Sequence, residues 1–339
     1  MFKVVSCAAI LSLCVASPVS ASPELLIEDF VGRVLIKTTS DSQISIVTEQ
    51  NIDDVQIYES GKSLKIDGGI PKPNGRNCKG LHGSISISLF KSEKHGRIGG
   101  YKNLRDYPKI TINAPKDTTL IVRNSIPFLI ADDLGAANLN LSSCGKVQLG
   151  DLSNNLEAHI RGSADLYLGD IGGNADIEVH GSGGIDMGDA KDLRLEVSGS
   201  GDVDARNITS ADISVRGSGD VELGNISGPL GVESRGSSDI DIGRVSGDFI
   251  YDGRGSGDLD IDSVIGRISV DVSGSGDVSI DGGKAQSLKV SASGASDFDF
   301  GGIAETADLY ASGASDIYVK KVTGEVRSKE TGAADIDID

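Results

Sequence analysis

The sequence has no tryptophan and few other large aromatic side chains. Its 339 residues include 7 Phe and 7 Tyr, together with only 2 Met. A wide core filled by aromatic rings is therefore excluded. Most of the apolar residues are Val, Ile, Leu and Ala, which suit a narrow coil with few inward positions per turn.

Long apolar runs are absent beyond the N-terminus. The first residues combine a basic Lys3, an apolar run from Ala8 to Ala16, and small residues ending at Ala21. This pattern predicts a secretory signal peptide over residues 1–21 with cleavage after Ala21, and hence a periplasmic or extracellular protein. No later stretch has the length of a transmembrane segment.

Positive charge is scarce. The 32 Lys and Arg are outnumbered by 50 Asp and Glu, which gives a formal net charge of −18. This balance argues against nucleic acid or an anionic membrane as the partner of the main body.

Cysteine is also rare, and recognisable cofactor motifs are missing. Two of the 4 cysteines, Cys78 and Cys144, lie beyond the predicted signal peptide. Two isolated cysteines do not make a metal site, and no phosphate-binding loop or nucleophile elbow is encoded, so no cofactor is expected. In an oxidising compartment Cys78 and Cys144 could pair, which would tie an early loop to the first clear repeat, or both could stay free.

What the sequence does contain is a four-residue phrase that returns every 18 to 20 residues. It reads Gly-Ser-Gly-Asp in its fullest form, and its copies begin at Gly162, Gly199, Gly217, Gly236, Gly255, Gly274, Gly294, Gly313 and Gly332, while Gly184 and Lys146 stand in place of the Asp in two further copies. A fixed period near 19 residues is typical of a solenoid, in which each repeat forms one turn of a coil.

Between the phrases, apolar and polar residues alternate. After Asp258, for example, Leu259 and Ile261 are followed by Val264 and then by Ile268, Val270 and Val272. Alternation with a period of two, ended by Gly or Asp, indicates short strands rather than helices. Identical strands at one period stack in parallel, so the sequence predicts an all-β, single-stranded parallel β-helix over residues 121–339.

The phrase has a structural interpretation and a functional one. Gly permits a tight turn. Stacking of the turns places the Asp residues in a column, and their mutual repulsion must be offset by neighbouring groups. Arg216, Arg235 and Arg254 precede the first Gly of successive copies, beside a column of Glu and Asp two residues earlier. These columns form either a solvated salt-bridge ladder or a ligand-binding stripe, and calcium binding by the Asp column is expected to be weak at most.

Residues 22–120 depart from the regular pattern. Strands are expected near 34–36, 43–47, 55–58 and 63–66, as irregular first turns or as a small β cap. At the other end, the inward positions Val326, Ser328 and Glu330 are mostly polar, which is typical of a terminal cap.

A basic excursion over residues 68–107 interrupts this first part. Its Lys and Arg residues greatly outnumber its acids and include Lys91, Lys94, Arg97, Lys102 and Arg105. Long loops often carry function, so this loop is a candidate contact site for anionic glycan, lipid headgroup or a partner protein. The alternative is that it folds back onto the acidic body.

The repeated phrase resembles that of the bacterial GIN-domain family, whose members are described as adhesin head domains. The resemblance also includes the segment from Pro108 to Pro115 and covers residues 25–339. It implies an exported, right-handed β-helix with an adhesin-like role, and it supplies no catalytic residues.

The hypothesis from sequence is a non-enzymatic binding protein of the cell envelope, whose partner is a cell-surface glycan or an envelope protein. A self-assembling scaffold is the alternative. A polysaccharide lyase or hydrolase is disfavoured, because turns of nearly equal length from residue 146 onward encode no groove walls around paired carboxylates.

Overall fold

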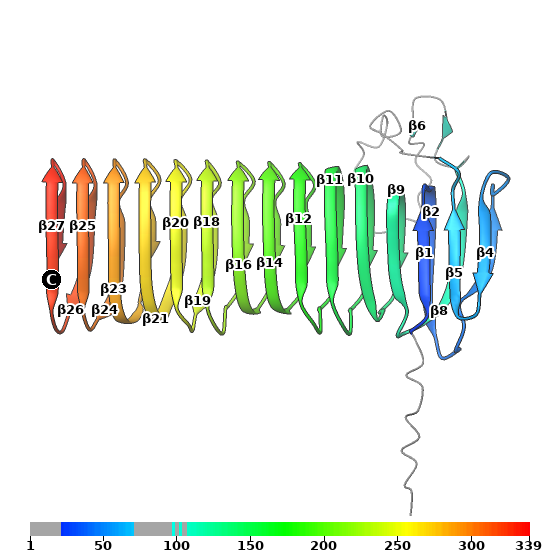
Figure 1. The fold of residues 1–339 in the computed structure, drawn as a ribbon, viewed down its shortest axis with the longest axis horizontal. Coiled ribbons are helices and arrows are strands. Elements are labelled where there is room, and N and C mark those ends of the chain that lie inside the picture. Colours follow the sequence, from blue (N-terminus) through cyan, green and yellow to red (C-terminus); the bar gives the residue numbers. More distant parts are fainter. Residues whose placement is uncertain (1–21, 71–96, 99–101, 104–106) are drawn as a thin grey trace, which may run out of the picture.

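The computed structural model describes residues 22–70, 97–98, 102–103 and 107–339. Over these residues the chain is an all-β solenoid that extends as a straight rod (Figure 1). The predicted solenoid with repeats of about 19 residues is confirmed. The right-handed sense implied by the family resemblance stays a prediction.

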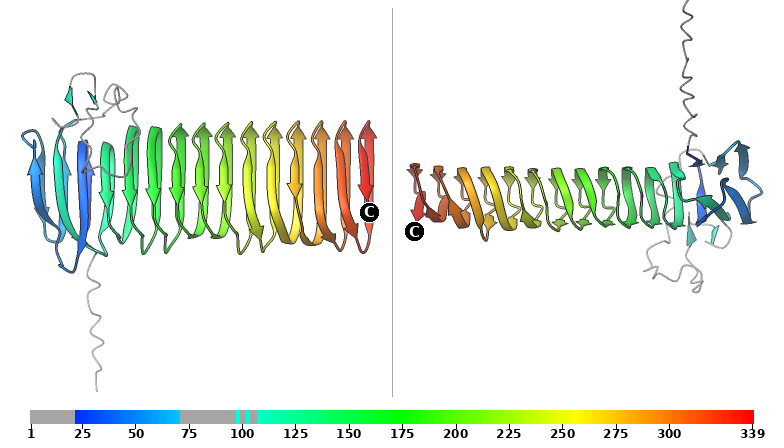
Figure 2. Two further views of the ribbon diagram at one scale, coloured as in Figure 1. Left: turned by 180° about the vertical axis from the view of Figure 1, so that it is seen from behind. Right: turned by 90° about the horizontal axis from the view of Figure 1, so that it is seen from below.

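The regular part of the rod consists of strands that each pair in parallel with the strand one turn later (Figure 2). Its strands are β9 Thr119–Ala131, β10 Ala136–Leu149, β11 Leu156–Leu168, β12 Ala175–Gly181, β13 Ile185–Met187, β14 Ala190–Gly199, β15 Val203–Ala205, β16 Ile208–Gly217, β17 Val221–Leu223, β18 Leu230–Gly236, β19 Ile240–Val245, β20 Phe249–Gly255, β21 Leu259–Gly274, β22 Val278–Ile280, β23 Gly283–Gly294, β24 Phe298–Ala304, β25 Ala307–Gly313, β26 Asp316–Val322, β27 Val326–Gly332 and β28 Asp335–Ile338.

Pairing keeps every copy of the phrase in register with the next. Gly199 faces Gly217, Gly217 faces Gly236, and Gly236 faces Gly255. Because side chains alternate across a strand, one register places all inward residues in columns that fill the coil. The described Val, Ile, Leu and Ala of these columns form one continuous buried cluster along the rod.

The first Gly of the phrase is required by two constraints at once. Gly217 has a φ of +143°, and a Cβ placed on it would lie 2.0 Å from the carbonyl oxygen of Gly199 one turn earlier. A positive φ disfavours any side chain, and the close approach of stacked backbones leaves no room for one. In the first full turn Ser143 occupies this position with a φ of +80°.

The core adapts to one large side chain inside the coil. Tyr251 is 3% exposed and replaces the aliphatic residues that flank it in its column. A Cβ placed on Gly253 would lie 2.5 Å from atoms of the Tyr251 ring, so only Gly fits there. In the preceding turn the residue in register with Gly253 is the small Ser234. Burial raises the pKa of the Tyr251 hydroxyl to about 12, although a hydrogen bond with Ser234 acts in the opposite direction.

The first strands are arranged differently from the coil. They are β1 Glu24–Glu28, β2 Val31–Thr39, β3 Ser45–Gln50, β4 Gln56–Ser60, β5 Ser63–Asp67 and β8 Lys109–Pro115. β3 pairs antiparallel with β8, and β4 pairs antiparallel with β5. β6 Arg97–Ile98 and β7 Lys102–Asn103 form a separate antiparallel pair.

At the opposite end, polar residues continue the inward columns. Ser328 and Glu330 of β27 are in register with the buried Leu309 and Ala311 of β25, as the sequence pattern predicts. Every residue of β27 is exposed. An apolar layer would favour addition of a further strand, so these polar side chains protect the edge.

We predict that Gly217→Ala lowers the free energy of unfolding by about 2 kcal/mol or more, because strain and a backbone clash coincide there. Gly231→Ala is the matched control, since a Cβ on Gly231 would meet nothing closer than 3.6 Å. Thermal and denaturant unfolding of both variants measure the difference. Equal stability of the two variants would contradict the role assigned to Gly217.

Candidate binding faces

The Asp residues of the phrase form a ladder along one corner of the rod. The Oδ1 atom of each accepts a hydrogen bond from the backbone N–H of the Asp one turn later, at 2.9–3.2 Å from Asp202 to Asp335, with Gly184 donating to Asp165 at the start. The Arg residues that precede the phrase were expected to offset the charge of this column. The partners of these carboxylates are instead backbone amides. At this corner the chain turns away from the strand pairing, and the carboxylate of one turn accepts the hydrogen bond of the N–H that the next turn would otherwise leave without an acceptor.

A second ladder lies at another corner, and the sequence analysis missed it. Asp170 accepts from the N–H of Asp189, Asp189 accepts from Asn207, and Asn207 accepts from Asn225. The signal was present as a polar Asp or Asn recurring at the same spacing as the phrase. Asn serves in this ladder as well as Asp does, so the acceptor oxygen matters more than its charge.

The three Arg candidates pair with the neighbouring acidic column, as the salt-bridge interpretation predicted. Arg216 lies 3.1 Å from Glu196 and 3.8 Å from Glu233, while Arg235 also pairs with Glu233. One turn further on, Arg254 lies 3.1 Å from Asp252 of its own strand β20. These side chains are half-exposed, so each pair contributes little stability. Their predicted role in binding stays a prediction.

His159 extends the same row of ion pairs. Its ring nitrogens lie 3.1 Å from Glu157 and 2.9 Å from Glu178. Burial by itself lowers the pKa of His159, but the hydrogen bonds with the two carboxylates outweigh it and raise the pKa above its ordinary value.

Another row of outward carboxylates has no Arg or His partner. These carboxylates lie on the short strands β13, β15, β17 and β19 and at the start of β21. Their outward residues Asp186, Asp204, Glu222, Asp241 and Asp260 follow one another in register, and we name them the acidic column. Within the described part of the chain no ion pair neutralises the acidic column. Partial burial and the neighbouring carboxylates raise the pKa of Asp260. A shallow hollow of about 350 Å³ lies beside Asp241 and Asp260.

The predicted contact residues of the basic excursion are not placed by the structure. Lys91, Lys94 and Arg105 lie outside the described residues, and Arg97 and Lys102 are described only as backbone in β6 and β7. Their role as a contact site therefore stays a prediction.

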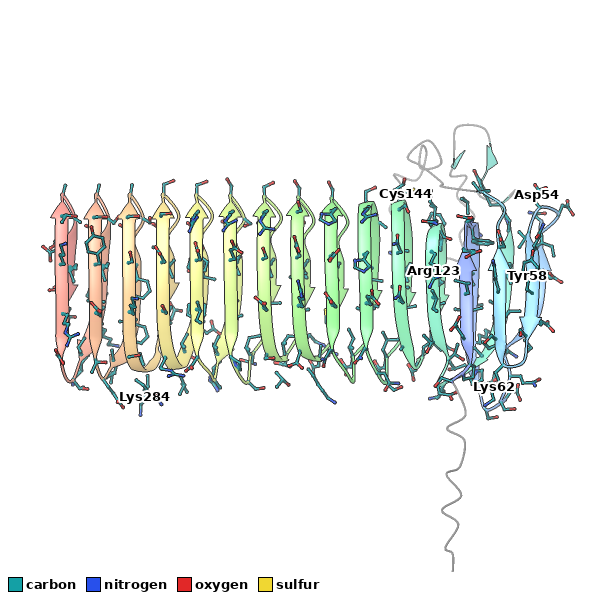
Figure 3. All side chains as sticks on the ribbon, viewed as in Figure 1. Asp54, Tyr58, Lys62, Arg123, Cys144 and Lys284 are labelled. Carbon is teal, nitrogen blue, oxygen red and sulfur yellow. The ribbon has the colours of Figure 1, made fainter. Side chains whose placement is uncertain are left out.

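Cys144 lies at the corner of the rod and is disulfide-bonded (Figure 3). It takes the place of the phrase Ser in the first full turn, since it is in register with Ser163. It packs in a small buried cluster of Val31, Tyr107, Ile126 and Phe128. Cys78 lies outside the described residues, so its pairing with Cys144 stays a prediction.

Two other kinds of site are absent from the described residues. No group of three or more His, Cys, Asp or Glu side chains there is arranged to hold a metal ion. Among the same residues no helix has the length and apolar character needed to cross a membrane.

Comparison with known proteins identifies the family. Residues 32–226 and 225–339 match the family described as "Putative auto-transporter adhesin, head GIN domain". The chain belongs to the GIN-domain family. No curated protein and no solved structure matches it. The resemblance seen in the phrase is thus confirmed, and the family's description is that of an adhesin head rather than an enzyme.

We predict that Asp258→Asn leaves stability unchanged or raises it, whereas Asp258→Ala lowers the free energy of unfolding by about 1 kcal/mol. Asn retains the oxygen that accepts from the N–H of Asp277 and removes one charge from a crowded column, while Ala leaves that N–H without its acceptor. Denaturant unfolding at neutral pH compares the three proteins. An Asn variant that is as unstable as the Ala variant would mean that charge, not the hydrogen bond, holds the ladder.

Proposed function

We propose that this GIN-domain chain is an exported, non-enzymatic binding protein of the bacterial cell envelope that attaches to surface glycan. The observation that carries the proposal is the strict register of the rod, which repeats the same outward side chains turn after turn. A polymeric ligand with its own repeat can contact such a surface at several turns at once, and weak contacts then add.

Two further features support an envelope role. The N-terminal pattern of residues 1–21 is that of a secretory signal, and the family is described as an adhesin head. The polar final turn bears on the alternative of a self-assembling scaffold. Ser328 and Glu330 disfavour end-to-end stacking of copies through β27.

The experiment uses the chain from residue 22 onward and isolated cell envelopes. We expect saturable binding in a sedimentation assay, with loss of binding when soluble polysaccharide extracted from the same envelopes is added as a competitor. Light scattering over increasing protein concentration, without envelopes, tests the scaffold alternative. Self-association with no saturable binding would contradict the proposal.

The same assay tests the basic excursion. A variant in which Lys91, Lys94 and Arg97 are replaced by Ala separates the excursion from the rod. Binding that survives this change assigns attachment to the rod, and loss of binding assigns it to the excursion.

A further inference from the structure

A groove of about 600 Å³ crosses five turns of the rod, in the first half of strands β12, β14, β16, β18 and β20. These strands lie side by side in the front layer of Figure 1, and their starts lie at the edge opposite Cys144, on the side of Lys284 in Figure 3. The groove runs over Ala175, Leu193, Ala211 and Leu230, whose side chains point into the coil and offer it almost no surface. All four are buried members of one inward column.

The groove exists because side-chain size varies along an otherwise regular column. Gly231 stands in register between Asp212 and Ile250, and its missing side chain opens the wall at that turn. Turns of nearly equal length supply no loop walls here, and side chains of unequal size form the walls of this groove instead.

One wall of the groove offers both hydrogen-bond donors and acceptors. Asp176, Arg194 and Asp212 follow one another in register and are exposed. Successive turns are about 4.8 Å apart, so a guanidinium lies between two carboxylates at that spacing. Within the described residues no ion pair or hydrogen bond of these three side chains occupies their polar atoms. The Arg residues near Glu196, Glu233 and Asp252 differ, because they are held in ion pairs.

The opposite wall is already occupied by internal bonds. The hydroxyl of Ser210 donates to Asp192, and Asp248 holds the guanidinium of Arg267 at 2.6 Å. Ile250 closes one end of the groove and is 60% exposed, the largest exposure among the exposed large hydrophobic residues of the described chain.

These features favour one class of occupant. A polyanion is disfavoured, because it would face the two carboxylates of the open wall and a chain of strongly negative net charge. The hydroxyls of a sugar both donate and accept hydrogen bonds, which matches a wall of alternating carboxylate and guanidinium. The C–H face of a sugar ring can pack on the exposed side chain of Ile250, and the volume lies within the range of known ligand sites.

We propose that this groove binds an uncharged oligosaccharide chain lying along the rod axis, with Asp176, Arg194 and Asp212 on its hydroxyls. The inference rests on the proposed function, since it names the place where the rod contacts glycan. Occupation of several turns by one chain would set the length of oligosaccharide that binds best.

Gly231→Tyr tests the groove, because it fills the groove without disturbing the coil. A Cβ on Gly231 has its nearest neighbour at 3.6 Å, and the residue has no positive φ. Gly184→Tyr is the matched control, since its Cβ would meet only Asp165 at 3.8 Å, outside the groove. Arg194→Ala is a second variant that removes the donor and leaves the groove open.

The assay is affinity electrophoresis in native gels that contain dextran, mannan or xylan as neutral probes, with alginate as an anionic probe and chitosan as a cationic one. We expect at least one neutral polysaccharide to retard the native chain and Gly184→Tyr equally. Gly231→Tyr and Arg194→Ala should bind that polysaccharide at least tenfold more weakly, with unchanged melting temperatures.

The outcomes separate this inference from the proposed function. If the native chain binds envelopes but Gly231→Tyr and Arg194→Ala keep native affinity for the neutral polysaccharide, the groove is wrong and the proposed function stands. Retardation by alginate or chitosan alone would overturn the assignment of an uncharged ligand. Absence of saturable binding to envelopes would remove the proposed function itself.

Discussion

The close stacking of one glycine on another supports the whole structure. At each corner the backbone of one turn approaches the carbonyl oxygen of the turn before so closely that a Cβ cannot fit, as at Gly217 over Gly199. The Asp three residues later then accepts the N–H of the next Asp. Together these contacts fix the register, and the register decides which side chains point inward and which point outward.

A fixed register distributes chemistry along lines instead of gathering it at one point. The faces of this rod differ accordingly: one carries carboxylates paired with Arg216, Arg235 and Arg254, and another carries the acidic column without such partners. The groove lies where the outward column on the first face is interrupted by Gly231. Sites that favour a ligand over solvent are therefore expected where the repeat is locally interrupted.

The sequence was sufficient to predict the period, the strands and the columns, because the phrase and the alternation around it repeat without long interruption. It predicted that Arg216 and its neighbours would pair with the flanking acids. It did not predict that backbone amides satisfy the Asp ladder, because that contact depends on the exact approach of two turns. The groove was missed for a related reason, since the effect of Gly231 depends on Asp212 and Ile250, which lie one turn away on either side. Similarly, Tyr251 fits the core only because Ser234 and Gly253 are small.

The most direct measurement deletes two whole units, Ser237 to Gly274, which joins Gly236 to Ser275 and restores the phrase. If each turn is an interchangeable layer, the shortened chain folds cooperatively, and small-angle X-ray scattering shows a rod shorter by about 10 Å, which is two layer spacings. The control is a deletion that retains three residues of the same stretch. It breaks the register and should not give a stable rod. Loss of folding in the in-register deletion, or equal folding of both deletions, would contradict the account.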